Sequence, residues 1–347
     1  MILLAGGLGF IGSNIAIELL KKNYNIVIVD NLSNSDISCL HILHELCLLY
    51  NIDNKNLNFV NIDLTNYSDT KNIFDVYNIN HVINLAGKKS VNESINLPNE
   101  YYYNNIFVHL NLVKLCDKYN ISSYIFSSSA TVYGSSKSPL NENSETGIGI
   151  TNPYGQTKYM IEQMIKDFSK VSKIKFIILR YFNPVGSDIT HKLGENPKNI
   201  PNNLMPIILS KLKTTNEISI YGNTYNTPDG TCLRDFIHIY DLSIGHIKAI
   251  NYIEKMHNNL EIFNLGTGNC ISVFSIIKKF NEVNNVNLKI NISEKREGDI
   301  DVCWANIDKA KNLLNFIPIK SIDDMCIDSF LFYNKKFDTT SLNIPKY

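Results

Sequence analysis

The sequence has no excess of either charge, because 33 Lys and Arg residues balance 33 Asp and Glu residues among 347. This balance leaves no basic field for nucleic acid and no polybasic patch for a membrane surface. No apolar run approaches the roughly 18 residues of a membrane span. The first ten residues, MILLAGGLGF, also lack the basic leader of a signal peptide. We therefore expect a cytoplasmic protein without a nucleic acid or membrane partner.

Cysteines are scattered along the chain: there are seven, and no two have Cys-x-x-Cys spacing. This pattern argues against a disulfide framework and against a zinc site, so we expect reduced thiols and no metal. Hydrophobic residues make up 44% of the chain and charged residues 19%, which is ordinary for a globular protein. The length allows a large core and two cooperating lobes.

Short apolar runs alternate with helical segments such as 12–22 and 101–119. The runs predict strands at Ile2–Ala5, Ile26–Asp30, Asn58–Asp63, His81–Ala86, Ser123–Ser128 and Phe176–Tyr181. This alternation is typical of an α/β fold with a Rossmann-type, doubly wound parallel sheet. We expect this dinucleotide-binding domain over residues 1–182, with a late strand near 262–268 returning to it. Residues 183–347 should form mainly a smaller α/β lobe that binds the substrate.

The first predicted turn, AGGLGFIGSN, is rich in glycine. Gly7, Gly9 and Gly12 have Gly-x-Gly-x-x-Gly spacing between a strand and a helix, which lets the backbone approach a pyrophosphate. Asp30 ends the second strand, where a carboxylate accepts from both ribose hydroxyls and repels a 2′-phosphate. Asp63 ends the third strand, where the adenine edge would lie, although a helix N-cap is its plainer interpretation. Together these residues predict an NAD site.

The stretch TNPYGQTKYM places Tyr154 and Lys158 on one face of a predicted helix start, with Asn152 as N-cap and Pro153 at the first position. A surface pair of this kind is common by chance. Ionising a free phenol at pH 7 costs about 4 kcal/mol, and an ammonium about 6 Å away returns roughly 2.8 kcal/mol at an effective dielectric of 20. Beside an oxidised nicotinamide, the pair predicts a phenolate base. Ser129, at a strand end in FSSSATVYG, can fold against the tyrosine.

These residues resemble those of the extended short-chain dehydrogenase/reductase superfamily, and within it the UDP-glucose/UDP-galactose 4-epimerases. The resemblance covers residues 1 to about 305 in eight ordered blocks: DNLSNS, VNESINLP, FSSSATVYG, NPYGQTKYMIEQ, LRYFNPVG, IPNNLMP, DGTCLRDFIH and REGD. It implies catalysis by Tyr154 as the base for the sugar 4-hydroxyl, with Lys158 lowering its pKa and Ser129 bridging the two hydroxyls.

The resemblance also implies two sets of binding residues. NAD would be held by Gly6, Gly7, Gly9, Phe10, Ile11, Gly12, Asp30, Asn31, Asn34, Asp63, Leu64, Ala86, Gly87, Lys89, Asn104 and Phe182, together with Tyr154 and Lys158. A UDP-hexose would be held by Asn183, Asn203, Leu204, Ser219, Tyr221, Arg234, Arg296, Asp299 and Cys303, together with Ser129 and Tyr154. Taken without the resemblance, Arg234 is better explained by an ion pair with Asp235, and Arg296 by a solvated loop charge.

The implied reaction is an NAD-dependent 4-epimerisation that interconverts UDP-galactose and UDP-glucose through a 4-ketose that rotates about its diphosphate link. Cys303 stands where family members restricted to these sugars have a bulky tyrosine. We therefore expect UDP-GalNAc and UDP-GlcNAc to be interconverted as well, although a small buried thiol without bearing on substrate is the plainer interpretation.

Three other functions remain open. A 4,6-dehydratase on this fold needs an Asp-Glu pair after Ser129, where this chain has Ala130 and Thr131, so elimination is disfavoured. A UDP-uronate or UDP-pentose 4-epimerase is excluded less firmly. A non-catalytic NAD-sensing regulator would not need Tyr154 and Lys158.

The helices expected at 101–119 and 153–169 carry apolar residues on more than one face. In the family, these two helices pair with their copies in a four-helix interface, so the resemblance implies a homodimer. Deeper packing within a monomer is the alternative.

Overall fold

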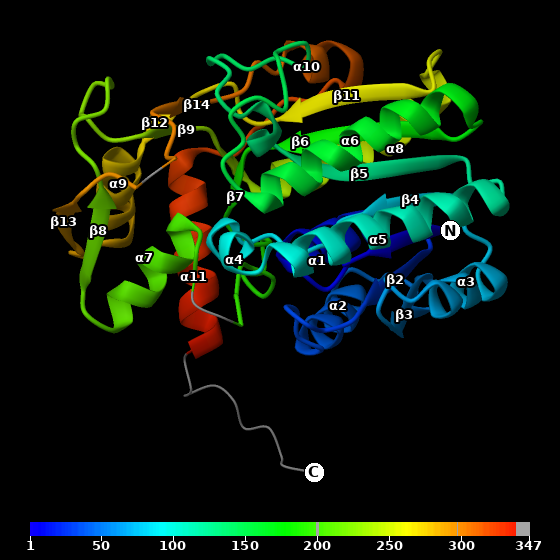
Figure 1. Cartoon of the computed structure of the whole chain (residues 1–347). Helices are drawn as coiled ribbons and strands as arrows, with labels where there is room; N and C mark the ends of the chain where they lie inside the picture. The colour runs from blue at the N-terminus through cyan, green and yellow to red at the C-terminus, as the bar shows by residue number, and fades with distance from the viewer. Residues whose placement is uncertain (199–200, 297, 338–347) are drawn as a thin grey trace.

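A seven-stranded parallel sheet forms the larger lobe of the molecule (Figure 1). The computed structural model describes residues 1–198, 201–296 and 298–337, so residues 199–200, 297 and 338–347 of the predicted substrate lobe lie outside the described residues. The strand order is β11–β6–β5–β4–β1–β2–β3. The strands are β1 Ile2–Ala5, β2 Ile26–Asp30, β3 Leu57–Asn61, β4 His81–Asn84, β5 Ser123–Ser129, β6 Lys175–Tyr181 and β11 Leu260–Leu265.

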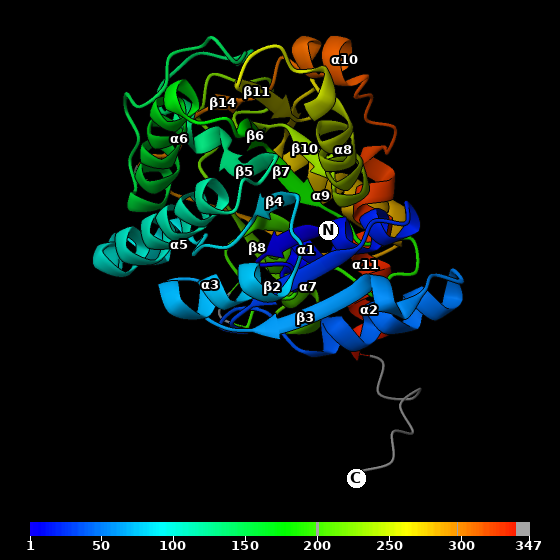
Figure 2. The same ribbon diagram turned by 90° about the vertical axis from the view of Figure 1, so that its right-hand side faces the viewer.

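Helices cover both faces of this sheet, as the two views show (Figures 1 and 2). One face packs on α1 (Phe10–Lys21), α2 (Ser38–Leu49) and α8 (Ile239–Tyr252). The other face packs on α3 (Tyr67–Val76), α5 (Pro98–Lys118) and α6 (Pro153–Val171). Alternate residues of β1 serve the two cores, with Ile2 and Leu4 on the first face and Leu3 on the second. The predicted doubly wound fold is confirmed.

The smaller lobe is built on a parallel pair of strands, β8 (Glu217–Tyr221) and β13 (Lys289–Ser293). Three helices pack around a core that includes Ile218, Phe280 and Met325. They are α7 Leu204–Lys213, α9 Val273–Asn284 and α11 Ile322–Phe337. The remaining elements are α4 Val91–Asn96, β7 Asn183–Val185, β9 Leu233–Arg234, β10 Phe236–His238, β12 Ile271–Ser272, β14 Val302–Cys303, α10 Asp308–Leu314 and the 3₁₀ turns Asn54–Asn56, Ala130–Tyr133 and Ile253–Lys255.

The predicted elements differ from the observed ones mainly at their ends. β3 and β4 each stop two residues early, so Asp63 and Ala86 lie in loops beyond the carboxyl edge of the sheet. The late strand predicted near 262–268 is β11, which pairs in parallel with β6 although some 80 residues separate them in sequence. Over the residues that are described, no helix has both the length and the apolar character needed to cross a bilayer.

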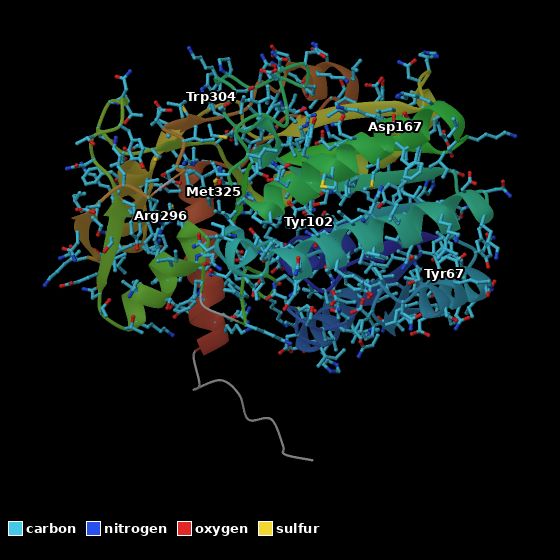
Figure 3. The ribbon with its side chains drawn as sticks, in the orientation of Figure 1. Tyr67, Tyr102, Asp167, Arg296, Trp304 and Met325 are labelled. Carbon is cyan, nitrogen blue, oxygen red and sulfur yellow. The ribbon has the colours of Figure 1, made fainter. Side chains whose placement is uncertain are left out.

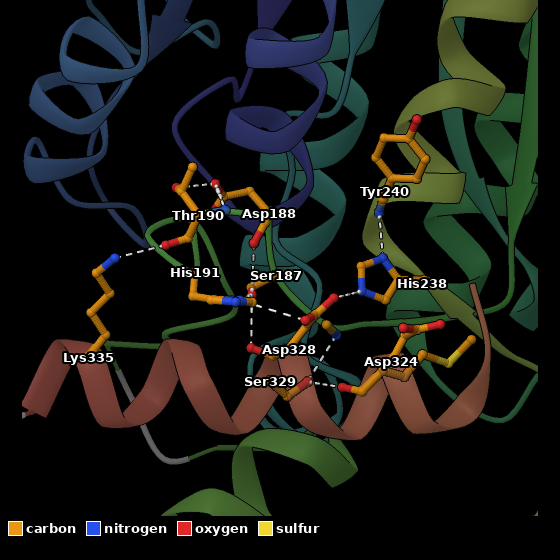
Figure 4. A network of polar contacts seen from close by, with 12 residues as sticks. Ser187, Asp188, Thr190, His191, His238, Tyr240, Asp324, Asp328, Ser329 and Lys335 are labelled. Carbon is orange, nitrogen blue, oxygen red and sulfur yellow. Dashed lines mark hydrogen bonds and ion pairs between the residues drawn. The ribbon is translucent and has the colours of Figure 1, made fainter. Parts of the chain in front are cut away.

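A polar network fastens α11 to the segment that follows β7 (Figure 4). The Asp328 carboxylate accepts from His238 Nε2 at 3.1 Å, and its other oxygen lies 3.7 Å from His191 Nδ1. Ser187 Oγ donates to the Asp328 carbonyl at 2.8 Å. Because residues 186–195 also contact α1 and α2, this network ties the small lobe to the sheet domain.

Candidate active site

The glycine turn between β1 and α1 is shaped by close backbone contacts. A Cβ on Gly12 would lie 2.5 Å from the Gly6 carbonyl oxygen and 2.6 Å from Gly7 Cα, so only glycine fits there. Gly6 has φ 73°, in the left-handed region. The N-cap residue of α1 is Gly9, which has no side chain to cap the helix, and the first turn of α1 holds no acidic residue. Its first N–H groups, which include Phe10 and Ile11, are therefore suited to an anion.

Asp30 is held at the end of β2 by three donors. Its Oδ2 accepts from Leu8 N at 3.0 Å, while Oδ1 accepts from Leu32 N at 3.0 Å and Ser35 Oγ at 2.7 Å. A carboxylate has about four acceptor positions, so room remains for a ribose hydroxyl. Asn34 follows in the same loop and is exposed.

Asp63 lies beside this loop, because Asn31 Nδ2 donates to its Oδ2 at 3.0 Å. Burial works to raise the pKa of Asp63, but hydrogen bonds from Thr65 and Asn31 outweigh it and lower that pKa. The N-cap of α3 is Asn66, so the helix-cap interpretation of Asp63 is wrong. Leu64 is buried next to it.

The next predicted cofactor residues, Ala86, Gly87 and Lys89, lie on the loop after β4. Asn84 Oδ1 accepts from Ala86 N at 3.1 Å, and Gly87 has φ 153°. The buried Asn105 amide holds Lys88 by both backbone groups and donates to Thr157 Oγ1 at 3.0 Å. Asn105 joins α5, α6 and this loop, and sequence reasoning missed it; its neighbour Asn104 is only partly buried.

The predicted catalytic residues come together at the start of α6. Asn152 Oδ1 accepts from Gly155 N at 2.8 Å, as the predicted N-cap requires. Lys158 Nζ donates to the Ser127 carbonyl at 2.7 Å and lies 5.8 Å from the centre of the Tyr154 ring. Ser129, the last residue of β5, forms a hydrogen bond with Tyr154.

Burial dominates the electrostatics of this pair. It raises the pKa of Tyr154, which the Ser129 hydrogen bond partly opposes. It lowers the pKa of Lys158 to about 8, against the attraction of Glu162. We predicted that the ammonium would lower the tyrosine pKa. The opposite direction holds without cofactor, because burial penalises both charged forms.

A second buried pair, the ion pair of Glu162 with Arg180, lies one helical turn beyond Lys158, and sequence reasoning missed it. Glu162, one turn after Lys158, accepts from Arg180 Nε at 3.0 Å and Nη2 at 2.7 Å, and from Ser128 Oγ at 2.6 Å. All of these side chains are buried. The spacing Lys-x-x-x-Glu could have drawn attention to Glu162, but its arginine partner comes from β6.

The predicted UDP residues lie in the smaller lobe, where Figure 3 labels Arg296. Arg234 Nη2 is 3.8 Å from Asp299 Oδ1, whereas Asp235 is turned away and binds the 267–268 backbone. The interpretation of Arg234 as a pair with Asp235 is therefore wrong. The Arg296 guanidinium lies 3.7 Å from the centre of the Tyr221 ring, and Arg296 is exposed, so the interpretation of a solvated loop charge stays open.

The other substrate candidates lie on the strands and helices around these two pairs. Asn183 Nδ2 donates to the Asp235 carbonyl at 2.8 Å. Ser219 is exposed on β8, and Leu204 begins α7. Cys303, on β14, is partly buried against a cluster that includes Phe182.

A sequence model of the NAD dependent epimerase/dehydratase family matches residues 2–266. The chain belongs to this family. It is 40% identical over 337 residues to the UDP-glucose 4-epimerase of Bacillus subtilis, covering 95% of each chain. It is also 40% identical over 332 residues to that of Dictyostelium discoideum, covering 95% of this chain and 94% of the other. The crystal structure of the Bifidobacterium longum UDP-glucose 4-epimerase with NAD+ and UDP has a TM-score of 0.89 at 37% identity, covering 97% and 98% of the two chains.

NAD is the cofactor of this family, and the groups at the carboxyl edge of the sheet fit it. The glycine turn leaves helix N–H groups for the pyrophosphate, and Asp30 keeps an acceptor position for the adenosine ribose. Lys158 would hold the nicotinamide ribose. Among the described residues, no cluster of three or more His, Cys, Asp or Glu side chains is suited to a metal ion.

Proposed function

We propose that the protein is a UDP-glucose 4-epimerase, which interconverts UDP-galactose and UDP-glucose with bound NAD. The observation that carries this proposal is the group Ser129, Tyr154 and Lys158 at the start of α6, beside the glycine turn. The smaller lobe adds the pairs Arg234–Asp299 and Arg296–Tyr221. Two arginines suit a pyrophosphate, and an aspartate suits ribose hydroxyls. We assign NAD binding to residues 1–182 and substrate binding mainly to residues 183–347.

In this mechanism, Tyr154 takes the proton of the sugar 4-hydroxyl, with Ser129 Oγ between the two oxygens. When bound, NAD supplies a reversible hydride acceptor for C4. Lys158 stabilises the phenolate, and Tyr154 returns the proton after the 4-ketose has presented its other face. Arg234 and Arg296 hold the diphosphate throughout, so the tight contacts are made away from the reacting ring and the sugar can turn.

Related proteins of known structure support both the main substrate and its alternatives. The Campylobacter jejuni protein, 30% identical with a TM-score of 0.81 over 96% of this chain and 99% of that one, is described as a UDP-Glc/GlcNAc 4-epimerase. The Stenotrophomonas maltophila UDP-glucose 4-epimerase, 31% identical, was solved with NAD and formylated UDP-arabinopyranose. A UDP-pentose or UDP-uronate epimerase therefore stays the alternative substrate assignment.

The small side chain of Cys303 supports acceptance of N-acetylated sugars. It lies on β14 next to Arg234 in register and packs on the cluster of Phe182, Tyr133 and Ala305. Burial raises the pKa of its thiol to about 11, so at neutral pH it is a compact neutral group. We infer that it leaves room for a 2-acetamido group, and that UDP-GalNAc and UDP-GlcNAc are also substrates.

Proton NMR of the purified protein with UDP-galactose tests the proposal directly. New signals of the 4-epimer should appear, and Tyr154→Phe should lose this turnover while still binding NAD. Conversion of UDP-pentoses or UDP-uronates alone would replace the substrate assignment. Full turnover by Tyr154→Phe would overturn the role of the base, and an absence of turnover with every UDP-sugar would favour the NAD-sensing regulator.

A homodimer through α5 and α6 is the assembly we propose. Tyr103, Phe107 and Leu110 on α5 are 56%, 45% and 37% exposed, at positions that share one helix face. Met160 on α6 is 37% exposed. An apolar stripe on neighbouring helices is suited to a second copy of the same stripe.

A further inference from the structure

Glu195 lies where the two lobes meet, in the segment between β7 and α7. One oxygen of its carboxylate, Oε1, accepts from two side chains: Lys89 Nζ at 2.8 Å and Asn203 Nδ2 at 2.7 Å. Lys89 belongs to the loop after β4, on the proposed cofactor path. Asn203 precedes α7 and belongs to the proposed UDP site. A single oxygen atom therefore contacts one residue of each proposed binding site.

Asn203 depends on Glu195 for its orientation. It is the N-cap residue of α7, a position where asparagine normally accepts from the helix N–H groups. In the described chain its side chain makes no such cap bond, and its amide nitrogen is directed to Glu195 instead. The carboxylate, and not the helix, therefore fixes the direction in which this amide points.

Only one of the two carboxylate oxygens of Glu195 has hydrogen-bond partners among the described residues. Its side chain is 9% exposed, and Oε2 is buried with no hydrogen-bond partner among the residues described. Glu195 lines a small cavity whose other walls are mainly apolar and include Val185, Met205 and Phe332. A buried carboxylate oxygen without a partner is uncommon in native proteins and needs an explanation. Lys192–Glu45, a comparable ion pair of the same segment, has its carboxylate 58% exposed.

The same segment contacts the cofactor loops at two further points. Lys198 Nζ donates to the Leu32 carbonyl at 2.7 Å, in the loop after Asp30. Asn202 Nδ2 donates to Ser90 Oγ at 2.9 Å, one residue from Lys89. The residues that lead into the UDP site therefore lie directly on the loops that would hold NAD.

We propose that Glu195 is a positioning residue that sets Asn203 for the UDP-sugar and Lys89 for NAD through the same oxygen, and so couples the two bound molecules. This inference rests on the proposed function. One carboxylate oxygen can accept from an ammonium and an amide at once, and its negative charge strengthens both hydrogen bonds. Neutralising Glu195 should weaken the binding of both the UDP-sugar and NAD. Neutralising the exposed Glu45, which pairs with Lys192, should weaken neither.

Glu195→Gln keeps the shape of the side chain and removes its charge, so it is the test variant. Isothermal titration of the NAD-loaded protein with UDP should show affinity weakened roughly tenfold, as expected for a lost charge-assisted hydrogen bond. Release of the cofactor should also be faster. It can be measured by fluorescence once the bound NAD has been reduced to NADH. Glu45→Gln is the matched control and should change neither quantity.

A double-mutant cycle separates positioning from general disorder. If Glu195 acts through Asn203, Glu195→Gln should change UDP affinity less than about twofold in an Asn203→Ala background. In a Lys89→Ala background its effect on NAD release should disappear in the same way. Equal effects with and without the partner side chain, or a lower melting temperature with unchanged UDP affinity, would overturn the inference. A wild-type protein that does not bind UDP would instead refute the proposed function.

Discussion

At the scale of single residues, burial sets the protonation of the proposed catalytic pair, Tyr154 and Lys158. Without cofactor, burial raises the pKa of Tyr154 and lowers that of Lys158, so each side chain resists its charged form. A positively charged nicotinamide ring beside Tyr154 would reverse this preference for the phenol. In the proposed mechanism, Tyr154 should therefore ionise only when oxidised cofactor is bound.

Lys158→Met should abolish epimerisation and yet stabilise the NAD-free protein. The folded pKa of Lys158, about 8, lies below its ordinary 10.5. Between these values the unfolded chain binds more protons, so this group makes stability rise with pH there, and its full penalty applies below pH 8. Offset by the lost bond to Ser127, removal of the charge should add about 1–2 kcal/mol at pH 7.

Urea unfolding at pH 7 and pH 10.5 checks this prediction. The advantage of Lys158→Met should shrink or disappear at the higher pH, where the wild-type lysine is neutral in the folded protein. A variant that is less stable than wild type at pH 7 would show that the ammonium is not penalised by its surroundings.

Cys303→Tyr should narrow the range of substrates without removing activity. A phenol in place of the thiol fills space beside Phe182, which a 2-acetamido group would need. We expect turnover of UDP-GalNAc to fall at least tenfold relative to UDP-galactose, as steric exclusion from a pocket can give. Competition kinetics with the two sugars measure this ratio. Cys303→Ser is the control of similar size, and a wild type inactive on UDP-GalNAc would refute the idea.

At the scale of elements, the attachment of α11 depends on Asp328. Burial works to raise the pKa of this carboxyl, but the His238 hydrogen bond and the charges of His238 and Lys320 outweigh it and lower the pKa. A depressed folded pKa means that the stabilisation is present above about pH 4 and is lost as pH falls through the folded value.

Asp328→Asn should therefore destabilise the protein by about 1–3 kcal/mol at pH 7, because the buried His238 side chain loses a charged acceptor. Denaturant unfolding should show the difference narrowing as the pH falls below about 4 and then through the lowered folded pKa of the wild-type carboxyl. Asp323→Asn, on the same helix with a side chain 50% exposed, should change stability little. A difference that persists unchanged at pH 3 would mean that the charge is unimportant.

Much of the sheet domain could be predicted from the sequence, because its strands and helix ends are marked by short, local sequence patterns. Apolar runs located β1 and β2 correctly, and Asn152 was recognised as the cap of α6 from its place before Pro153. The partners of Arg234 and Glu162 could not be predicted in this way. Asp299 is 65 residues from Arg234 and Arg180 is 18 from Glu162, so only the folded chain brings them together.

At the scale of the whole molecule, the proposed function divides cofactor and substrate binding between the two lobes. The sheet domain presents its carboxyl edge, and the small lobe presents Arg234 and Arg296 from short strands and loops. The helix α6, which carries the proposed catalytic residues, packs beside α5 on one face of the sheet. An interface on these two helices would therefore support the same helix that carries Tyr154 and Lys158.

Phe107→Glu should convert the proposed dimer into a monomer. Tyr103 and Phe107 stack with ring centres 4.7 Å apart on the exposed face of α5, so a charge at 107 would have to be buried against a second copy. Burying an unpaired charge costs several kcal/mol, enough to weaken dimerisation more than about a hundredfold.

Sedimentation velocity of Phe107→Glu should show half the wild-type mass. Leu48→Glu, at an exposed position on α2 across the sheet, should leave the wild-type mass unchanged. Since α6 carries the proposed base, Tyr154, we also expect the monomer to have a lower turnover while it still binds NAD. If the wild-type protein sediments as a monomer, the exposed residues Tyr103, Phe107 and Leu110 of α5 have no role in assembly.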